Sequence, residues 1–187
     1  MKLVVAITGA SGVIYGVRFL EKLEGTGAEP HLIVSENGER LLRHELSLEA
    51  RDLAPKAKAC YSPDEVGALP ASGSAGLEAM VIIPCSMRTL SMVATGSSSN
   101  LIGRAADVML KEGRPLVLVT RETPLSPIHL ENMLKLARLG VRILPASPGF
   151  YHKPNTMDDL VNHVVGKVMD ALGLPHGLFP PWQGESG

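Results

Sequence analysis

Short apolar runs rich in β-branched residues alternate along this chain with segments that carry apolar residues at helical spacing. The candidate strands span residues 3–7, 31–34, 80–83, 116–119 and 141–144. The candidate helices span residues 13–23, 38–45, 87–94, 102–111, 127–139 and 157–172, the last with Asn155 or Thr156 as its cap. Apolar runs of this length are typical of strands buried on both faces of a parallel sheet. The pattern predicts an α/β fold, a doubly wound Rossmann-like or flavodoxin-like three-layer sandwich with a mainly parallel sheet, because a barrel needs eight strands.

The length of 187 residues, with 45% hydrophobic residues, suits one well-buried domain, which we expect over residues 1–174. The Pro- and Gly-rich remainder, residues 175–187, is interpreted either as a frayed tail or as an arm on a neighbouring subunit. Proline and small residues also fill the stretch 50–76, which predicts a long loop with a functional role. Only 20% of the residues are charged, so apolar surface remains that favours oligomerisation.

Charge and cysteine usage argue against several classes of function. The formal net charge is −1 and the basic residues are scattered, so neither nucleic acid nor an anionic membrane surface is an expected partner. Cys60 and Cys85 lie far apart without a CxxC pattern, which favours reduced thiols and a cytoplasmic location. The six histidines form no HExxH motif, so no protein-held metal is expected. The apolar run near Met1 is too short for a signal peptide and predicts a first strand instead, and no membrane span is expected.

A small-residue motif follows the first candidate strand, at the strand end where open α/β sheets collect their ligands. The motif Thr8-Gly9-Ala10-Ser11-Gly12 opens the first helix. Its backbone amides and the Ser11 hydroxyl suit either a nucleotide or flavin anion, or a tight turn that needs glycine for its geometry. The spacing is not GxGxxG, and the chain has no Tyr-x-x-x-Lys pair, so a short-chain dehydrogenase is disfavoured.

Hydroxyl groups stand at helix starts after the second and third strands. Ser35 suits either a ligand ribityl chain or a helix cap, and capping is the commoner role. Ser86 and Thr89, in the motif Pro84–Leu90, can cradle a phosphate or a polar chain. Cys85 beside them is either a nucleophile without an evident base or a small buried residue.

An adjacent cation and carboxylate, Arg121–Glu122, follow the fourth strand directly, which marks that strand end as the place to seek a site. Arg104 and Lys111 are seven residues apart on one helix, with Asp107 between them, an arrangement typical of a solvated salt-bridged face. Two further polar residues, taken singly, suit structural or surface roles: Tyr151 and Lys167.

Taken together and in order, these segments closely resemble the flavin prenyltransferase family, the UbiX-type enzymes. The resemblance covers nearly the whole chain. It rests on the motifs Thr8–Gly12, Pro70–Ser74, Pro84–Leu90, Ala105–Glu112, Arg121–Met133 and Pro148–Tyr151. It implies a metal-independent transferase that joins a dimethylallyl group from dimethylallyl monophosphate to N5 and then C6 of reduced FMN. The product, prenylated FMN, would serve a partner UbiD-type decarboxylase. The resemblance also implies a homododecamer whose FMN and prenyl-phosphate residues come from different subunits.

The family resemblance also assigns residues to the two ligands. The implied FMN-binding residues are Gly9, Ala10, Ser11, Ser35, Ser86, Met87, Arg88, Thr89 and Arg121. The implied prenyl-phosphate residues are Arg104, Lys111, Glu122, Tyr151 and Lys167, with Ser72 and Glu45 nearby. The implied catalytic residues are Glu122, Lys111, Glu45 and Ser11.

The chemistry agrees with those assignments. Breaking an allyl monophosphate leaves a phosphate dianion, which the three cations and the Tyr151 hydroxyl would stabilise. Glu122 would transfer protons to and from the phosphate or the flavin. Two positions depart from the family pattern: Val66 stands where an aromatic residue is expected, and Lys167 stands where some members carry Arg, which keeps the charge but loses bidentate geometry.

Two other functions stay open at this point. An FMN-dependent cysteine decarboxylase of the same superfamily would carry a Pro-Ala-Ser-Ala-Asn-Thr type of loop and a catalytic histidine, for which His44 is the candidate. A non-enzymatic flavin carrier would give Lys111, Glu122 and Lys167 no role, so alanine at those positions would not matter. The pathway, quinone synthesis or aromatic acid breakdown, and the choice of monophosphate over pyrophosphate also stay open.

Overall fold

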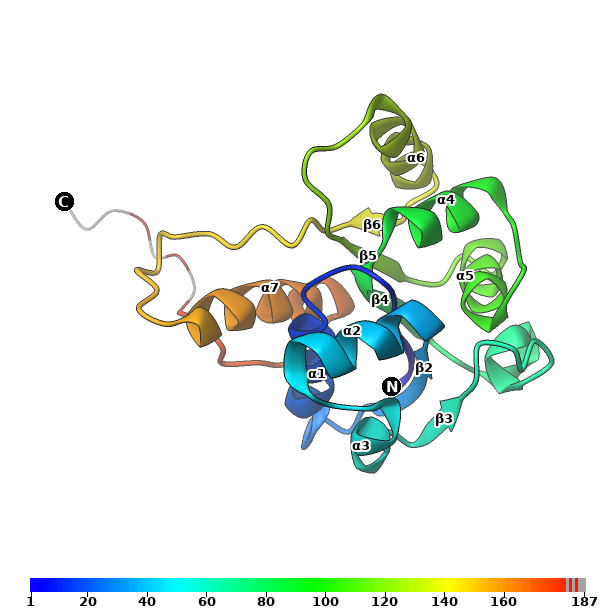
Figure 1. Cartoon of the computed structure of the whole chain (residues 1–187), viewed down its shortest axis with the longest axis horizontal. Helices are drawn as coiled ribbons and strands as arrows, with labels where there is room; N and C mark the ends of the chain where they lie inside the picture. The colour runs from blue at the N-terminus through cyan, green and yellow to red at the C-terminus, as the bar shows by residue number, and fades with distance from the viewer. Residues whose placement is uncertain (181, 183, 185–187) are drawn as a thin grey trace.

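The computed structural model describes residues 1–180, 182 and 184 and contains one parallel β-sheet (Figure 1). Its strands are β1 (Lys2–Ile7), β2 (Glu29–Val34), β3 (Ala59–Tyr61), β4 (Ala79–Cys85), β5 (Leu116–Thr120) and β6 (Arg142–Ile143). The strand order is β3-β2-β1-β4-β5-β6, and every neighbouring pair is parallel. The order reverses between β1 and β4, which is where a doubly wound sheet opens a crevice for ligands. The predicted fold class is confirmed.

Helices cover both faces of this sheet. They are α1 (Ile14–Leu23), α2 (Glu36–Leu46), α3 (Ala50–Leu53), α4 (Met87–Thr95), α5 (Leu101–Lys111), α6 (Pro127–Arg138) and α7 (Met157–Leu172). In Figure 1, α1, α2 and α7 lie on one side of the sheet and α4 and α5 on the other, while α6 packs beside α4 and projects from the body. The predicted helices are all present, and Thr156 is the cap of α7.

The alternation of side chains along the buried strands divides the core into two clusters. In β1, Leu3, Val5 and Ile7 join the cluster that includes α1 and α7. Val4 and Ala6 point the other way and join the cluster that includes α4 and α5. Because both faces of β1 are fully buried, the strand reads as a continuous apolar run. The sheet is therefore rigid where its carboxyl edge supports the loops of the site.

The stretch 50–76 differs from the predicted long loop. It contains α3, the strand β3, and three short 3-10 turns at Ala54–Lys56, Leu69–Ala71 and Gly73–Ala75. The strand escaped prediction because it is three residues long, sits at the sheet edge, and lacks β-branched residues. Backbone pairing with β2 defines it, since His31, Leu32 and Ile33 stand opposite its three residues.

The described part of the C-terminal tail packs on its own chain. Phe179 contacts His163 of α7, with 4.8 Å between the ring centroids. The rest of the tail prediction, at residues 181, 183 and 185–187, lies outside the described residues. Within the described part of the chain, no helix combines the length and the apolar character that crossing a membrane requires.

Candidate functional site

The carboxyl ends of β1 and β4 are joined by one threonine, which fixes the loops on either side of the crevice. The Thr8 hydroxyl donates to the carbonyl of Pro84 over 2.8 Å and accepts from the backbone amide of Ser86 over 2.9 Å. Thr8 is only 1% exposed, so these bonds are shielded from water. The small-residue loop after β1 and the Ser86 loop after β4 are therefore held in a fixed relation.

Glu45 of α2 anchors the loop after β1. Its carboxylate accepts from the backbone amide of Gly12 at 2.9 Å and from that of Val13 at 3.1 Å. These amides lie at the start of α1, where a helix attracts negative charge. The sequence left open either a ligand anion on the loop amides or a tight turn, and Glu45 takes the two amides nearest the helix. The carboxylate expected to be catalytic thus also holds the loop in place.

Two glycines in this region have a structural reason, one in close packing and one in its backbone conformation. A Cβ on Gly9 would collide with the side chain of Asn37, so the loop lies directly against α2. Gly12 has a φ of +96°, a conformation that residues with side chains rarely adopt. Ala10 is buried and Ser11 is exposed. The loop therefore presents backbone and the Ser11 side chain to the crevice.

Ser35 and Ser86 both cap helices. Ser35 accepts from the amide of Gly38 over 3.0 Å at the start of α2. Ser86 accepts from the amide of Thr89 over 3.2 Å at the start of α4, and the two hydroxyls are 3.0 Å apart. The capping interpretation is therefore correct for Ser35, and Ser86 has the same role. Each hydroxyl can also donate and accept further bonds, so capping leaves room for a ligand contact.

Three further residues near Ser86 have different environments. Met87 is half-buried against the α4 core cluster, and Arg88 is exposed. Cys85 is fully buried, and burial raises the pKa of its thiol far above the usual range. A thiol held in its protonated form is a poor nucleophile, so Cys85 is a core residue.

Arg121 follows β5 and brings an unpaired donor to the same edge. Its backbone amide donates to the carbonyl of Cys85 over 3.4 Å. Within the described residues, its buried Nε has no hydrogen-bond partner. Burial raises the pKa of Tyr15, and the Arg121 charge acts in the opposite direction, which places the guanidinium near that ring. A buried donor without a partner is rare, so this group fits a polar ligand atom.

Glu122 lies beside Arg121 and is exposed. Its carboxylate accepts from the backbone amide of the next residue, Thr123, over 3.0 Å. Thr123 and Pro124 lead into α6, which Ser126 caps through the amide of His129 at 3.3 Å. The chain therefore brings the cation of Arg121 and the carboxylate of Glu122 to the carboxyl edge of the sheet, next to the crevice.

The residues assigned to the prenyl phosphate are not all brought together in one chain. Arg104 and Lys111 are exposed on α5, and Lys111 is the last residue of that helix. Tyr151 and Lys167 belong to the α7 side, across the sheet from α5. Among the ion pairs of the described residues, none joins Arg104 or Lys111 to Asp107, so the predicted salt-bridged face is absent there.

The Pro70–Ser74 loop packs against α5. Arg114 holds it, donating to the carbonyls of Gly73 over 2.7 Å and Leu77 over 2.9 Å. Ser72 is exposed, and its hydroxyl lies 2.9 Å from that of Ser74. Val66, which replaces the expected aromatic residue, is 43% exposed. Ser72 and the α5 cations therefore form one surface of the chain.

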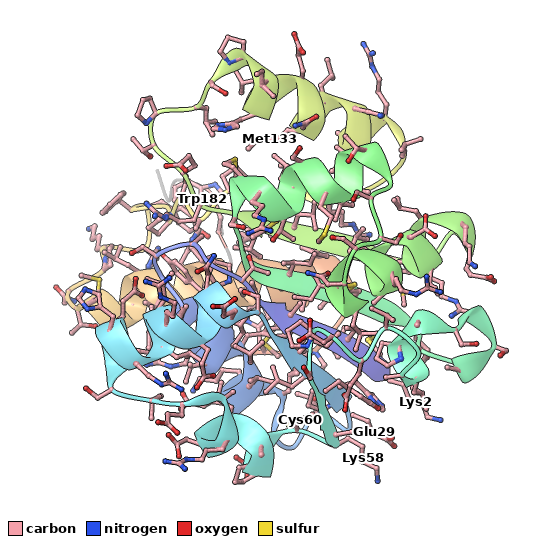
Figure 2. The ribbon with its side chains drawn as sticks, turned by 45° about the vertical axis from the view of Figure 1, so that its right-hand side comes forward. Lys2, Glu29, Lys58, Cys60, Met133 and Trp182 are labelled. Atoms are coloured by element: carbon pink, nitrogen blue, oxygen red, sulfur yellow. The ribbon has the colours of Figure 1, made fainter. Side chains whose placement is uncertain are left out.

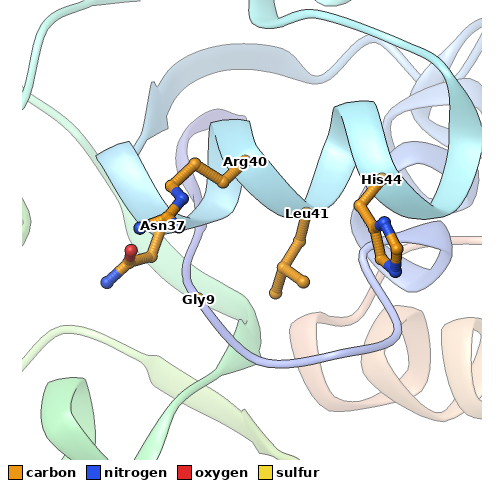
Figure 3. A pocket seen from close by; sticks show the side chains of 5 residues that line it. All are labelled: Gly9, Asn37, Arg40, Leu41 and His44. Carbon is orange, nitrogen blue, oxygen red and sulfur yellow. The ribbon is translucent and has the colours of Figure 1, made fainter.

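A hollow of about 410 Å³ lies between α2 and the loop after β1, as Figure 3 shows. Gly9, Asn37, Arg40, Leu41 and His44 line it. Of these residues, Gly9 and His44 were predicted from the sequence, whereas Asn37, Arg40 and Leu41 were not. Their spacing of three to four residues along α2 is the signal that could have found them, because it places them on one helix face.

Comparisons with known proteins agree with this geometry. The flavoprotein family model matches residues 1–169. A flavin prenyltransferase UbiX of Methanothermobacter thermautotrophicus is 48% identical over 98% of this chain and 96% of its own length. The crystal structure of a dodecameric FMN-dependent UbiX-like decarboxylase of Escherichia coli O157:H7 is 48% identical and matches with a TM-score of 0.96, over 98% of this chain and 100% of its own.

A second solved structure, AnUbiX (PadA1) in complex with FMN and dimethylallyl pyrophosphate, also has a TM-score of 0.96. It is 40% identical and covers 99% of this chain and 98% of its own. The similarity is therefore close over both whole chains in sequence and in fold. On the strength of these matches, the chain belongs to the flavin prenyltransferase (UbiX) family.

Proposed function

We propose that this chain transfers a dimethylallyl group from dimethylallyl monophosphate to N5 and C6 of reduced FMN. The observation that carries the proposal is the buried Nε of Arg121, which has no hydrogen-bond partner among the described residues, at the carboxyl edge of the sheet with Glu122 beside it. The same edge collects the loop at Gly9 and the two serine caps. Similarity to flavin prenyltransferases supports the assignment of this edge to FMN.

The FMN site would use the nine residues that the family resemblance assigns to it. These are Gly9, Ala10, Ser11, Ser35, Ser86, Met87, Arg88, Thr89 and Arg121. The loop at Gly9 packs directly against Asn37 of α2, which fixes its backbone beside the proposed flavin site. The Arg121 Nε would donate to a polar atom of the flavin. When bound, the reduced flavin supplies the two nucleophilic positions of the reaction.

The remaining residues would handle the charge of the prenyl phosphate. Arg104, Lys111 and Lys167 would neutralise the phosphate as the ester carbon–oxygen bond breaks, and the Tyr151 hydroxyl would donate to it. Glu122 would accept and return protons during the transfer. Ser11, Glu45 and Ser72 would complete the site. Glu45 would keep the Ser11 loop in position through its bonds to Gly12 and Val13.

The proposed site is shared between subunits of a homo-oligomer, which we take to be a dodecamer. Arg104 and Lys111 lie across the sheet from Tyr151 and Lys167, so a single chain presents the two groups on different surfaces. Exposed apolar residues on and around α6 offer contact surface, with Ile128 at 67% and Leu139 at 62% exposure. The dodecameric E. coli protein supports the same assembly.

The product, prenylated FMN, would serve a UbiD-type decarboxylase, as in ubiquinone biosynthesis. We place the enzyme in the cytoplasm, in keeping with its two free cysteines. The AnUbiX complex contains the pyrophosphate ester, so both esters belong in the assay.

The proposal is tested by anaerobic incubation of the purified protein with reduced FMN and dimethylallyl monophosphate, followed by mass analysis of the released flavin. A flavin heavier by one C5 prenyl unit is expected, and Glu122→Ala should abolish or stall its formation. Unmodified FMN from a wild-type protein that binds flavin tightly would contradict prenyl transfer and favour a flavin carrier.

A further inference from the structure

The chain after α7 turns back and packs along that helix. We call residues 175–180 the C-terminal strap. The Phe179 ring of the strap lies 4.8 Å from the ring of His163 and 5.1 Å from that of His176, centroid to centroid. The His176 side chain is only 10% exposed. The Phe179 ring therefore holds the strap against His163 of α7, and His176 of the strap packs against the same Phe179 ring.

Two histidines form the seat of Phe179. The rings of His152 and His163 stack in parallel, with centroids 4.9 Å apart and 2° between the planes. Burial lowers the pKa of His163, and the nearby His152 and Lys167 lower it further. The His163 Nδ1 accepts from the amide of Gly149 over 3.2 Å. A neutral imidazole presents a flat surface on which an aromatic ring can rest.

Gly166 forms a notch for the strap in the middle of α7. A Cβ at this position would collide with the Phe179 ring and would lie 2.9 Å from Cε1 of His176. Glycine inside a helix destabilises it relative to alanine. Its presence in the buried middle of α7 therefore has a packing reason, which is the close approach of the strap.

The strap also contacts the ammonium group of Lys167. The Lys167 Nζ lies 5.2 Å from the centre of the Phe179 ring and 3.3 Å from Oδ2 of Asp170. The other Asp170 oxygen is 2.9 Å from Nε2 of His176. Burial alone would raise the pKa of Asp170, but the hydrogen bonds from His176 and Lys167 outweigh it and leave the pKa lowered. Phe179 and His176 thus fix the surroundings of Lys167.

A second aromatic residue of the tail contacts the other assigned residue of this surface. The Trp182 ring meets the Tyr151 ring edge-on, with centroids 5.8 Å apart and 83° between the planes. Figure 2 labels Trp182 beside the chain that precedes α7. Tyr151 also meets His163 edge-on, at 5.5 Å. Lys167 and Tyr151 therefore each contact an aromatic residue that follows α7, Phe179 and Trp182 respectively.

We propose that Phe179 is a positioning residue for Lys167, held in place by the Gly166 notch. This inference rests on the proposed function, in which Lys167 binds the prenyl phosphate. A lysine side chain loses rotamer entropy when it is fixed. Because Phe179 restrains the ammonium group before the phosphate arrives, less of that entropy is lost on binding. Loss of the strap should weaken phosphate binding and leave FMN binding unchanged.

The experiment compares Gly166→Ala and Phe179→Ala with the wild-type protein, and uses Gly177→Ala as the matched control. The Gly177 position has open space around it, so its new methyl group meets nothing. Trp182 is the only tryptophan, and its quenching by acrylamide reports the position of the tail. Steady-state prenyl transfer gives KM and kcat for dimethylallyl monophosphate, and a titration gives the Kd of FMN.

Both test variants should show stronger Trp182 quenching and a KM raised by about three- to tenfold, the size expected for losing a cation–π contact. The kcat and the Kd of FMN should stay within twofold of wild type, and Gly177→Ala should match wild type throughout. Phe179→Tyr should restore the wild-type KM because it keeps the ring. If Gly166→Ala fails to fold, Phe179→Ala decides the question.

An unchanged KM in a variant whose Trp182 quenching has increased would overturn the positioning role. Unchanged quenching in both variants would overturn the docking of the strap itself. Failure of the proposed function is a separate result, because the wild-type protein would then release unmodified FMN, while the quenching comparison would still report on the strap.

Discussion

Glu45 illustrates how one carboxylate can hold a loop in place through its backbone amides. It bonds to two backbone amides where α1 begins, and the loop that carries Ser11 leads directly into them. The sequence could supply the residue only through family resemblance, because its role depends on a contact 33 residues away. Local patterns do not report which helix face meets which loop.

Removing this anchor should destabilise the fold measurably. Glu45→Ala leaves two partly buried amides without their charged acceptor, which costs about 1.5–3 kcal/mol. Urea unfolding measures this loss. Glu24→Ala, which changes an exposed glutamate, should stay within about 0.5 kcal/mol of wild type. Equal stability of the two variants would show that the Glu45 bonds contribute nothing.

Arg121 should determine FMN affinity through its Nε as well as its charge. Arg121→Lys keeps the charge but removes the buried donor, so the Kd of FMN should rise by about tenfold or more, as expected for losing a charged hydrogen bond. A fluorescence titration measures this Kd. The exposed Arg142 of β6 gives the matched control, Arg142→Lys, which should bind FMN like the wild type. An unchanged Kd for Arg121→Lys would place the flavin elsewhere.

At the scale of elements, the start of α7 can be predicted from the sequence, because a local capping motif marks it. Its start carries a reciprocal cap, in which Thr156 accepts from the amide of Asp159 over 3.1 Å and Asp159 accepts from that of Thr156 over 2.9 Å. Such a signal is local and therefore readable. The strand β3 is the opposite case, since only its pairing with β2 defines it.

The cap of α7 should make stability depend on acid. Hydrogen bonds from the Asn155 and Thr156 amides and the Thr156 hydroxyl lower the pKa of Asp159. Its folded pKa lies below the unfolded value of about 3.9, so its contribution is complete above that pH and is lost as the pH falls through the folded pKa. Urea unfolding from pH 6 to about pH 2.5 should show a shallower acid slope for Asp159→Asn. An identical slope would show that Asp159 does not contribute to the acid dependence of stability.

Thr156→Ala tests the same cap at neutral pH. It should cost about 0.5–2 kcal/mol, because the amide of Asp159 loses its acceptor. The midpoint of urea unfolding measures the change, and the exposed Thr95→Ala at the end of α4, which removes no helix cap, is the comparison. If both variants unfold at the wild-type midpoint, the capping box does not stabilise α7.

At the scale of the whole molecule, the fold was readable from strand and helix alternation, whereas the composition of the site was not. The residues proposed to bind FMN follow the ends of adjacent strands, so topology alone gathers them. The residues proposed to bind the prenyl phosphate sit on α5, on α7, after β5 and after β6, and no local pattern says that these surfaces meet. Only the family resemblance assigns Lys111 and Lys167 to one site, and because they lie on opposite sides of the sheet, the proposed site needs a partner subunit.

The most direct test of this account mixes two inactive variants. Lys111→Ala and Lys167→Ala are co-expressed, purified as mixed oligomers, and assayed for prenylated FMN by mass analysis beside each variant alone. If each site takes Lys111 from one chain and Lys167 from another, some sites in the mixture hold both lysines and prenylated FMN reappears. If both lysines of a site come from one chain, every site lacks one of them, and a mixture as inactive as its parents would contradict the shared site.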